Sequence, residues 1–324
     1  MVSENKVIVS KVVPGRPLVI PHGVISAKPD PRIRRVKVHD PSTSKECELK
    51  YEVVSRDIVI QALPAELGSP RVMVELDDGS EVTFRSREVN LSGATNFRDS
   101  GGYHVKAGIL PWDRVFRSDN LAKLSLADWQ KIHSLGIRRI VDLRVAEERS
   151  QSPTKLPEDF SDIELISIPM IGEIAGTMDA ISVILKGGLE SITAFDMGEM
   201  YRIMLGSHFD DFLVVLSLLE EDSSSATLVH CTAGKDRTGL VVAFYQLRSG
   251  VRIEDVLSDY VRSNILRTPF RVEFLTPIFN EAGIDITRFI PYLSAPPKAF
   301  FEALAFARKR YPALVYPRPE GRLN

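Results

Sequence analysis

A cysteine and an arginine stand six residues apart in one short segment, His230-Cys231-Thr232-Ala233-Gly234-Lys235-Asp236-Arg237-Thr238-Gly239. An apolar run typical of a buried strand precedes it, and a helical stretch follows it. A loop that curls into a helix N-terminus directs several backbone N–H groups into one concavity, which suits phosphate. Gly234 permits the tight curvature, and Arg237 offers a planar fork for two phosphate oxygens. The helix dipole and nearby cations favour the thiolate of Cys231, so the segment predicts in-line attack of this sulfur on a phosphoryl group.

The spacing of cysteine and arginine alone is a weak signal, because arginine is common in this chain. The preceding strand, the following helix, Gly234 and the hydroxyl of Thr238 must all coincide, and together they make a strong signal. They disfavour the alternative of a buried core cysteine followed by a solvated turn. A nucleotide-binding Walker A loop is excluded, because Asp236 follows Lys235 where that loop needs Ser or Thr.

The segment resembles the Cys-x5-Arg-Ser/Thr signature of the protein tyrosine phosphatase superfamily. Four further segments are similar to the bacterial tyrosine and lipid phosphatases of that superfamily: Asn96-Phe97-Arg98-Asp99-Ser100-Gly101-Gly102, Val115-Phe116-Arg117-Ser118-Asp119, Val141-Asp142-Leu143-Arg144 with Glu147-Glu148, and Asp259-Tyr260-Val261-Arg262-Ser263-Asn264. The resemblance covers about residues 90 to 312 and leaves the N-terminal region outside it.

The resemblance implies a two-step hydrolysis that uses no metal ion and no organic cofactor. Cys231 takes the phosphoryl group and becomes a phosphocysteine, and Arg237 holds the phosphoryl oxygens. The other residues that it implies for phosphate binding are Thr232, Ala233, Gly234, Lys235 and Thr238. Thr238 also eases departure of the thiolate in the second step, and His230 orients the loop and tunes the thiol.

The general acid has two candidates. Asp236 could protonate the leaving oxygen, or it could be a structural carboxylate paired with a nearby cation. Related enzymes usually carry the acid on a separate mobile loop, and the matching region, after Ile168-Pro169, lacks Trp-Pro-Asp but contains Glu173. The Lys235-Asp236 pair resembles members that act on phosphoinositides, in which the lysine could meet a second phosphate.

Several residues are expected to support the site. Arg98 and Asp99 border it or brace its loop, and bracing is the favoured role. Asp142 and Arg144 end a predicted strand on the side where open α/β sheets bind ligands, and support of the loop is again favoured. The helical region from Gly172 to Leu219 is expected to be either a lid over the site or, by preference, an ordinary packed helix.

Composition narrows the class of protein. The chain has 324 residues, 44% of them hydrophobic, and a formal net charge of −2, which excludes a generally basic nucleic-acid binder. The two cysteines, Cys47 and Cys231, form neither a disulfide framework nor a zinc site, as a reducing cytoplasmic compartment allows. We expect Cys47 to be a buried apolar residue. The sequence predicts no integral membrane segment and leaves the oligomeric state open.

Two domains are expected. Residues 1–90 contain about seven short runs typical of strands and predict an all-β, sandwich-like accessory domain. Cys47 to Val54 is taken as one strand, and Asp77-Asp78-Gly79-Ser80 as a hairpin turn. Residues 91–324 alternate strands and helices and predict an α/β domain with a mainly parallel, tyrosine-phosphatase-like sheet flanked by helices. Its first helix begins after Ser125, the expected N-cap, and Asp128 at the third helical position comes near the capping-box pattern.

The function that these patterns favour is a phosphomonoester hydrolase acting on phosphotyrosine proteins. A phosphoinositide or dual-specificity phosphatase is the alternative, and the order of protein and lipid substrates stays open. An inactive phosphate-binding module is disfavoured, because Cys231, Arg237 and Thr238 are all present. Sulfur transfer and arsenate reduction are disfavoured on two grounds. The loop extends to Arg237 and the following hydroxyl, which favours phosphate, and no second cysteine stands near Cys231 in the sequence for a resolving step.

Overall fold

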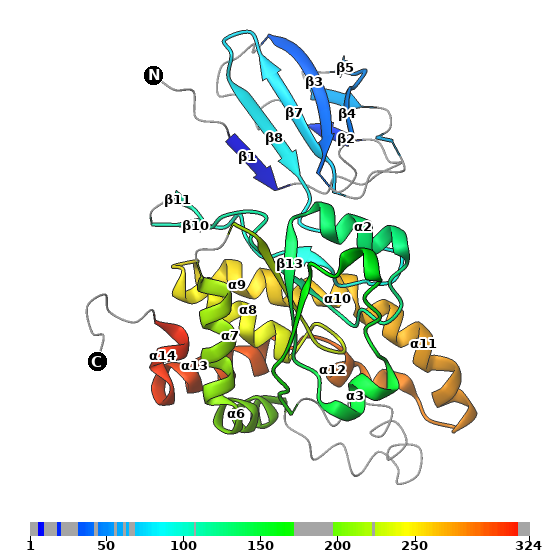
Figure 1. Cartoon of the computed structure of the whole chain (residues 1–324), viewed down its shortest axis with the longest axis vertical. Coiled ribbons are helices and arrows are strands. Elements are labelled where there is room, and N and C mark those ends of the chain that lie inside the picture. The colour runs from blue at the N-terminus through cyan, green and yellow to red at the C-terminus, as the bar shows by residue number, and fades with distance from the viewer. Residues whose placement is uncertain are drawn as a thin grey trace. The chain divides into compact units, whose positions relative to one another are not determined.

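The computed structural model describes residues 6–9, 18–20, 32–41, 45–54, 57–60, 63–64, 69–106, 108–171, 197–221 and 224–316. The chain divides into two compact units (Figure 1). The first unit comprises residues 1–92 and 125–136, and the second comprises residues 93–124 and 137–324. The predicted division near residue 90 is a simpler one, because the segment 125–136 belongs by its contacts to the first unit.

Two sheets form most of the first unit. The five-stranded sheet runs in the order β1 (Lys6–Val9), β8 (Glu81–Arg85), β7 (Arg71–Leu76), β3 (Ile33–Asp40) and β4 (Lys45–Glu48). All its pairs are antiparallel except β1 with β8. The three-stranded antiparallel sheet runs in the order β2 (Leu18–Ile20), β6 (Asp57–Ile60) and β5 (Glu52–Val54). Apolar side chains from both sheets form one buried cluster.

Alternation of buried and more exposed residues along the strands accounts for the core of the first unit, but one strand predicted from the sequence is wrong. β7 alternates half-buried and buried residues, so one face of its sheet joins the core. The predicted hairpin turn joins β7 to β8, with Gly79 at φ +80°. The single strand predicted from Cys47 to Val54 is instead β4 and β5, which belong to different sheets. Cys47 is exposed, not buried. It lies on β4, the edge strand of its sheet, and all four residues of β4 are exposed.

Helix α2 (Leu126–Ser134) completes the first unit. Ser125 and Asp128 form the predicted capping box, and the helix ends just before Gly136, which has φ +78°. The carboxylate of Asp128 also accepts hydrogen bonds from the backbone N–H and the hydroxyl of Ser92, at 2.8 and 2.6 Å. These bonds explain why α2 groups with the segment that precedes residue 93.

A mixed five-stranded sheet lies at the centre of the second unit. Its order is β14 (Glu164–Ser167), β13 (Ile137–Asp142), β15 (Ala226–His230), β12 (Val115–Ser118) and β9 (Arg98–Asp99). The first four strands are parallel and β9 is antiparallel to β12. A short hairpin, β10 (His104–Val105) and β11 (Gly108–Ile109), lies apart from this sheet.

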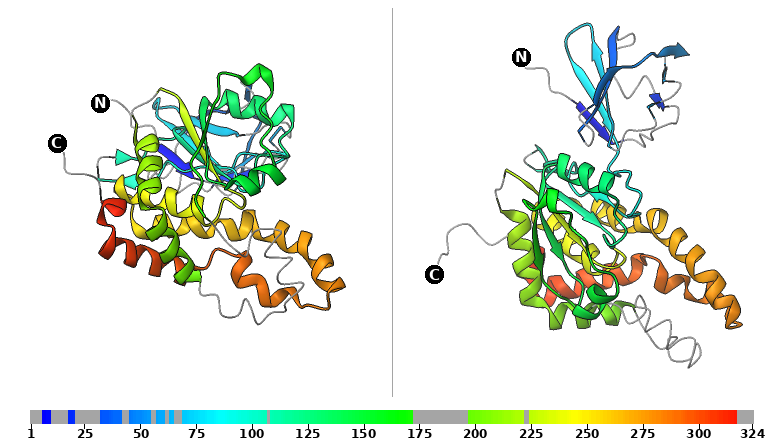
Figure 2. Two further views of the ribbon diagram at one scale, coloured as in Figure 1. Left: turned by 60° about the horizontal axis from the view of Figure 1, so that its bottom comes forward. Right: turned by 45° about the vertical axis from the view of Figure 1, so that its right-hand side comes forward.

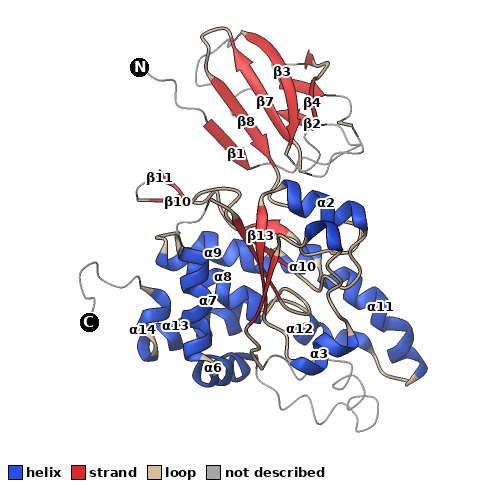
Figure 3. Ribbon diagram, viewed as in Figure 1, coloured by secondary structure: helices blue, strands red, loops and turns tan. Residues whose placement is uncertain are grey.

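Helices flank this sheet (Figure 3). They are α3 (Ala146–Gln151), α6 (Met197–Ser207), α7 (Phe209–Glu220), α8 (Arg237–Arg248), α9 (Ile253–Val261), α10 (Ser263–Leu266), α11 (Thr268–Glu281), α12 (Ile290–Leu293), α13 (Pro297–Arg310) and α14 (Pro312–Val315), with 3-10 turns at Glu158–Phe160 and Ile286–Phe289. Across the described ranges, no helix is long and apolar enough to cross a bilayer.

Two hydrophobic clusters organise these helices. The larger one joins β13 and β15 to α6, α7, α8 and α13. A smaller cluster joins α11 to the turn at Ile286–Phe289, and α11 extends away from the sheet (Figure 2). The helical region predicted up to Leu219 is broken at His208 between α6 and α7, and its residues 172–196 lie outside the described residues.

Candidate active site

The predicted strand, loop and helix around Cys231 are confirmed. β15 is buried at every position and lies between β12 and β13, which are both parallel to it. The loop 231–236 leaves its carboxyl end, and α8 begins at Arg237. Open α/β sheets bind ligands outside the carboxyl ends of their strands, and this loop lies at such an end.

Gly234 makes the loop sharply curved. Its φ is +64°, and a side-chain Cβ at this position would lie 2.3 Å from the carbonyl oxygen of Ser118. Only glycine fits a site with both constraints. The backbone N–H of Gly234 donates to Sγ of Cys231 at 3.2 Å, and Cys231 is 2% exposed. The loop therefore encloses the sulfur and directs an amide dipole at it.

Glu148 on α3 holds the guanidinium of Arg237 through two hydrogen bonds. Nη1 and Nη2 of Arg237 donate to Oε2 and Oε1 of Glu148 at 2.6 and 2.7 Å, and Thr232 donates its hydroxyl to the same carboxylate. Glu148 also caps its own helix by accepting from the backbone N–H of Val145 at 3.0 Å. Burial would raise the pKa of Glu148, but the hydrogen bonds and charge of Arg237 outweigh it and the pKa is lowered. A charged pair thus fixes the arginine beside the loop.

The two charged residues inside the loop are buried and paired. Lys235 donates from Nζ to the carbonyl oxygen of Tyr292 on α12 at 2.6 Å, and its Nζ lies 3.4 Å from Oδ2 of Asp236. Tyr201 on α6 donates its hydroxyl to Oδ1 of Asp236 at 2.5 Å. Burial and the charge of Asp236 raise the pKa of Tyr201 well above its ordinary value, so it stays a neutral donor. Asp236 is therefore held by a hydroxyl donor at one carboxylate oxygen and lies near a cation at the other, an arrangement that fits either of its two predicted roles.

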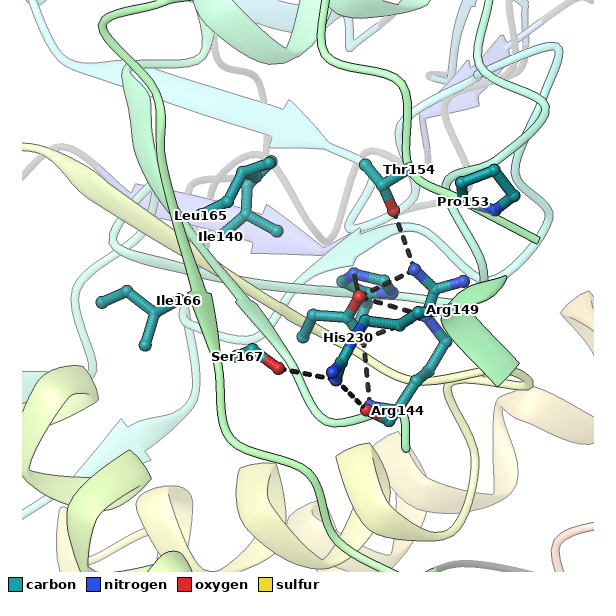
Figure 4. Close-up of a pocket in the computed structure, with 10 residues that line it drawn as sticks. Ile140, Arg144, Arg149, Pro153, Thr154, Leu165, Ile166, Ser167 and His230 are labelled. Atoms are coloured by element: carbon teal, nitrogen blue, oxygen red, sulfur yellow. Dashed lines mark hydrogen bonds and ion pairs between the residues drawn. The ribbon is translucent and has the colours of Figure 1, made fainter. Parts of the chain in front are cut away.

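His230 lies beneath the loop. It is fully buried, and its Nδ1 is 3.3 Å from the carbonyl oxygen of Cys231. Burial lowers the pKa of His230 to about 4, although the charge of Asp142 opposes this shift, so the imidazole is neutral near pH 7. His230 and Asp142 border a pocket of about 260 Å³ with Arg144 and Arg149 (Figure 4).

The pair Asp142 and Arg144 is placed at the end of β13, as predicted. Arg144 donates from Nη2 to Oδ2 of Asp142 at 2.7 Å and from Nη1 to the side-chain oxygen of Asn120 at 3.0 Å. The backbone N–H of Asn120 in turn donates to the carbonyl oxygen of Thr232 at 3.2 Å. This chain of contacts joins the end of β13 to the candidate phosphate loop.

The other residues predicted for the site do not share one location. Arg98 is fully buried and donates from Nη1 to Oδ1 of Asn96 at 2.6 Å. Asp99 accepts from the backbone N–H groups of Gly101 and Asp113 at 2.7 and 2.8 Å, which stabilises the turns that follow β9. The hydroxyl of Thr238 is buried and has no hydrogen-bond partner within the described parts of the chain. Glu173 lies outside the described residues.

Sequence reasoning assigned no role to four residues that contact the loop or support it: Asn96, Arg117, Glu148 and Tyr201. The first three stand inside the family-like segments, which was the only signal for them. Tyr201 had no signal, because nothing in a helical sequence shows which distant carboxylate a buried tyrosine will meet.

Comparisons with known proteins show the family of this chain. A sequence model of the tyrosine phosphatase family matches residues 89–314. The tyrosine-protein phosphatase of Nostoc commune is 32% identical over 162 residues, which are 49% of this chain and 51% of that protein. The triple specificity protein phosphatase PtpB of Mycobacterium tuberculosis is 29% identical over 197 residues, which are 54% of this chain and 68% of that protein.

The match spans about half to two thirds of the length of these relatives. Among solved structures, the crystal structure of P. aeruginosa TpbA aligns with 47% of this chain and 71% of its own, at 18% identity and a TM-score of 0.27. The family match, by contrast, covers most of the chain and includes the whole Cys231-to-Arg237 loop. The chain therefore belongs to the tyrosine phosphatase family.

Proposed function

We propose that this chain hydrolyses phosphomonoesters through a phosphocysteine on Cys231, with phosphotyrosine proteins as its leading substrates. One observation carries the proposal: Cys231 is enclosed by a loop that directs the Gly234 amide at its sulfur, and Glu148 fixes Arg237 at the end of that loop. This arrangement supplies a nucleophile, backbone donors and a planar cation at one place.

The reaction has two steps. In the first, the sulfur of Cys231 attacks phosphorus, the bond to the leaving oxygen breaks, and that oxygen takes a proton. In the second, water attacks the phosphocysteine, the S–P bond breaks, and phosphate leaves with Cys231 again a thiolate. Arg237 and the amides from Thr232 to Thr238 hold the phosphoryl oxygens in both steps. The hydroxyl of Thr238, which has no hydrogen-bond partner among the described residues, is suited to receive the returning charge on sulfur.

Asp236 is the proposed general acid, and Tyr201 and Lys235 would hold it in place. Glu173 remains the second candidate. An acid that protonates the leaving oxygen matters most when that oxygen is strongly basic. Asp236→Asn should therefore slow release from a phosphotyrosine peptide much more than from para-nitrophenyl phosphate. Glu173→Gln should slow neither substrate more than the other. If Glu173→Gln selectively slowed release from the phosphotyrosine peptide and Asp236→Asn did not, the general acid would be Glu173.

Substrate range and surroundings belong to the same proposal. Lys235 would meet a second phosphate if the substrate were a phosphoinositide, which is the alternative substrate class. The region 1–90 would be an accessory β-sandwich, and the enzyme would work in the cytoplasm. An inactive phosphate-binding module is the alternative of another class.

The decisive experiment measures phosphate release from a phosphotyrosine peptide, a phosphoserine peptide and a set of phosphoinositides, for the wild type and Cys231→Ser. We expect the phosphotyrosine peptide to react fastest and Cys231→Ser to lose at least about 1,000-fold in kcat/KM, because its hydroxyl is a far weaker nucleophile. If a phosphoinositide released phosphate fastest, phosphoinositides would replace phosphotyrosine proteins as the leading substrate class. If the folded wild type released no phosphate from any of these substrates, the phosphatase proposal would fail and the inactive phosphate-binding module would be the remaining alternative.

A further inference from the structure

We infer that Asn96 and Arg117 form a clamp on two outward-facing carbonyls of the loop, and that Asn96 is thereby a positioning residue for phosphoryl transfer. Asn96 donates from Nδ2 to the carbonyl oxygens of Ala233 and Gly234 at 2.9 and 3.1 Å. Arg117 on β12 donates from Nη2 to the same Gly234 oxygen at 2.6 Å. Both side chains are fully buried. The inference rests on the proposed function for its kinetic consequences.

A buried ionic network sets the orientation of the clamp. Arg98 donates from Nη1 to Oδ1 of Asn96 at 2.6 Å, so the amide oxygen faces Arg98 and the amide nitrogen faces the loop. Asp259 on α9 bridges the two arginines: Nε of Arg98 lies 3.0 Å from Oδ1, and Nη1 of Arg117 lies 2.6 Å from Oδ2. A flipped Asn96 amide would set its nitrogen against the guanidinium of Arg98 and its oxygen against the loop carbonyls, so the network permits one orientation.

Holding a carbonyl also holds the amide that follows it. In a trans peptide the C=O of one residue and the N–H of the next point in opposite directions. Asn96 holds the carbonyl of Ala233, and the next N–H, that of Gly234, points at the sulfur of Cys231 at 3.2 Å. Asn96 and Arg117 together hold the carbonyl of Gly234, which directs the N–H of Lys235 away from the clamp by the same rule.

This orientation matters most in the transition state. Charge then spreads over the equatorial phosphoryl oxygens, and donors that are already aligned need no reorganisation. A peptide plane free to rotate would lose its donor and could turn a carbonyl oxygen toward the phosphoryl group. The clamp therefore acts on catalysis through the backbone, without contact between Asn96 and the substrate.

The test compares Asn96→Ala and Asn96→Asp with a matched control, Gln246→Ala. Asn96→Asp keeps the shape of the side chain and the acceptor for Arg98 but replaces the donors to the loop with an oxygen that the two carbonyls repel, whereas Asn96→Ala removes the donors without adding a charge. Kinetics are compared only for variants whose melting transition shows that they fold. Gln246 is also a fully buried amide that donates to a backbone carbonyl, that of Ser100 at 3.0 Å, and it belongs to neither the loop nor the network. Melting temperature, kcat, KM and the affinities for vanadate and inorganic phosphate are measured for all four proteins.

We expect both Asn96 variants to lose about 10- to 100-fold in kcat, as for other small misplacements of catalytic groups, with a smaller change in KM. Vanadate, whose bound form mimics the five-coordinate transition state, should lose more affinity than tetrahedral phosphate. Gln246→Ala should keep kcat and the ratio of the two affinities. Equal losses of vanadate and phosphate affinity in both Asn96 variants, or a loss of kcat no larger than that of Gln246→Ala, would overturn the clamp. If the wild type releases no phosphate, the proposed function fails, while the ratio of affinities from calorimetry still tests the clamp.

Discussion

The apolar core of the first unit and the surroundings of the candidate loop in the second unit are built differently. The cluster shared by the two sheets of the first unit consists of apolar side chains such as Val36, Val74 and Phe84, although Asp40 and Arg85 of the same unit are also buried. Around the candidate loop, the second unit buries charged side chains that contact one another, including Arg98, Arg117 and Asp259. Apolar burial stabilises a fold directly, whereas buried ions lose hydration that their pairing only partly restores.

The two units therefore differ in the kind of contact that specifies their structure. In the first unit, any well-packed set of apolar residues of similar volume would serve. In the second, each charge has a partner at a defined atom, and the network ends on the carbonyl oxygens of the loop. We interpret the network as a device for geometry more than for stability, and three predictions test the contrast with the first unit.

The largest effect on stability is expected from Asp259→Ala. This change leaves the buried guanidiniums of Arg98 and Arg117 without the carboxylate that joins them. Removing one partner of a buried ion pair costs about 3–5 kcal/mol in the free energy of unfolding. Urea unfolding of the whole chain measures it. The control is Asp285→Ala, which removes an exposed cap on the Thr287 backbone and should cost about 1 kcal/mol. Equal costs for the two variants would contradict a buried network.

The next effect depends on pH through His230. Its pKa is lowered to about 4 by burial, against 6.5 for an ordinary histidine, so the unfolded chain takes up a proton first as the pH falls. Stability from this group is complete above about pH 6.5 and is lost progressively toward pH 4, by up to about 3 kcal/mol. The lowered pKa of Glu148 adds a further loss only below its ordinary value of 4.5.

Unfolding free energies between pH 7 and 4.5 measure this slope. His230→Asn should flatten it relative to the wild type, whereas His104→Asn, at an exposed position, should leave it unchanged. An unchanged slope in His230→Asn would show that the imidazole is not held neutral by burial.

The smallest effect is expected from Val74→Ala in the apolar core of the first unit. Val74 is fully buried, and the change should cost about 2 kcal/mol of stability for the lost methyl groups and the cavity they leave. It should leave kcat/KM unchanged, because the residue has no part in the loop network. The measurement is melting temperature and kcat/KM together, with Val53→Ala on the exposed part of β5 as the control. A large fall in kcat/KM would break the contrast between the units.

Local patterns predicted much of the fold correctly. The strand Ala226–His230, the capping box of α2 and the turn at Gly79 each depend on neighbouring residues, and each is confirmed. The same reasoning was wrong for the run from Cys47 to Val54. Alternation within a run does not show where the chain leaves one sheet for another, so the split into β4 and β5 and the exposure of Cys47 were not predicted.

The candidate loop and the resemblance to the family could be recognised from the sequence, because cysteine, glycine and arginine stand there at spacings of only a few residues. Which distant side chains hold that loop follows only from the three-dimensional fold. Asn96 meets Ala233 across 137 positions of the chain, and Glu148 meets Arg237 across 89. Such contacts depend on the order of strands in the sheet and on the packing of helices around it, and no local periodicity records either.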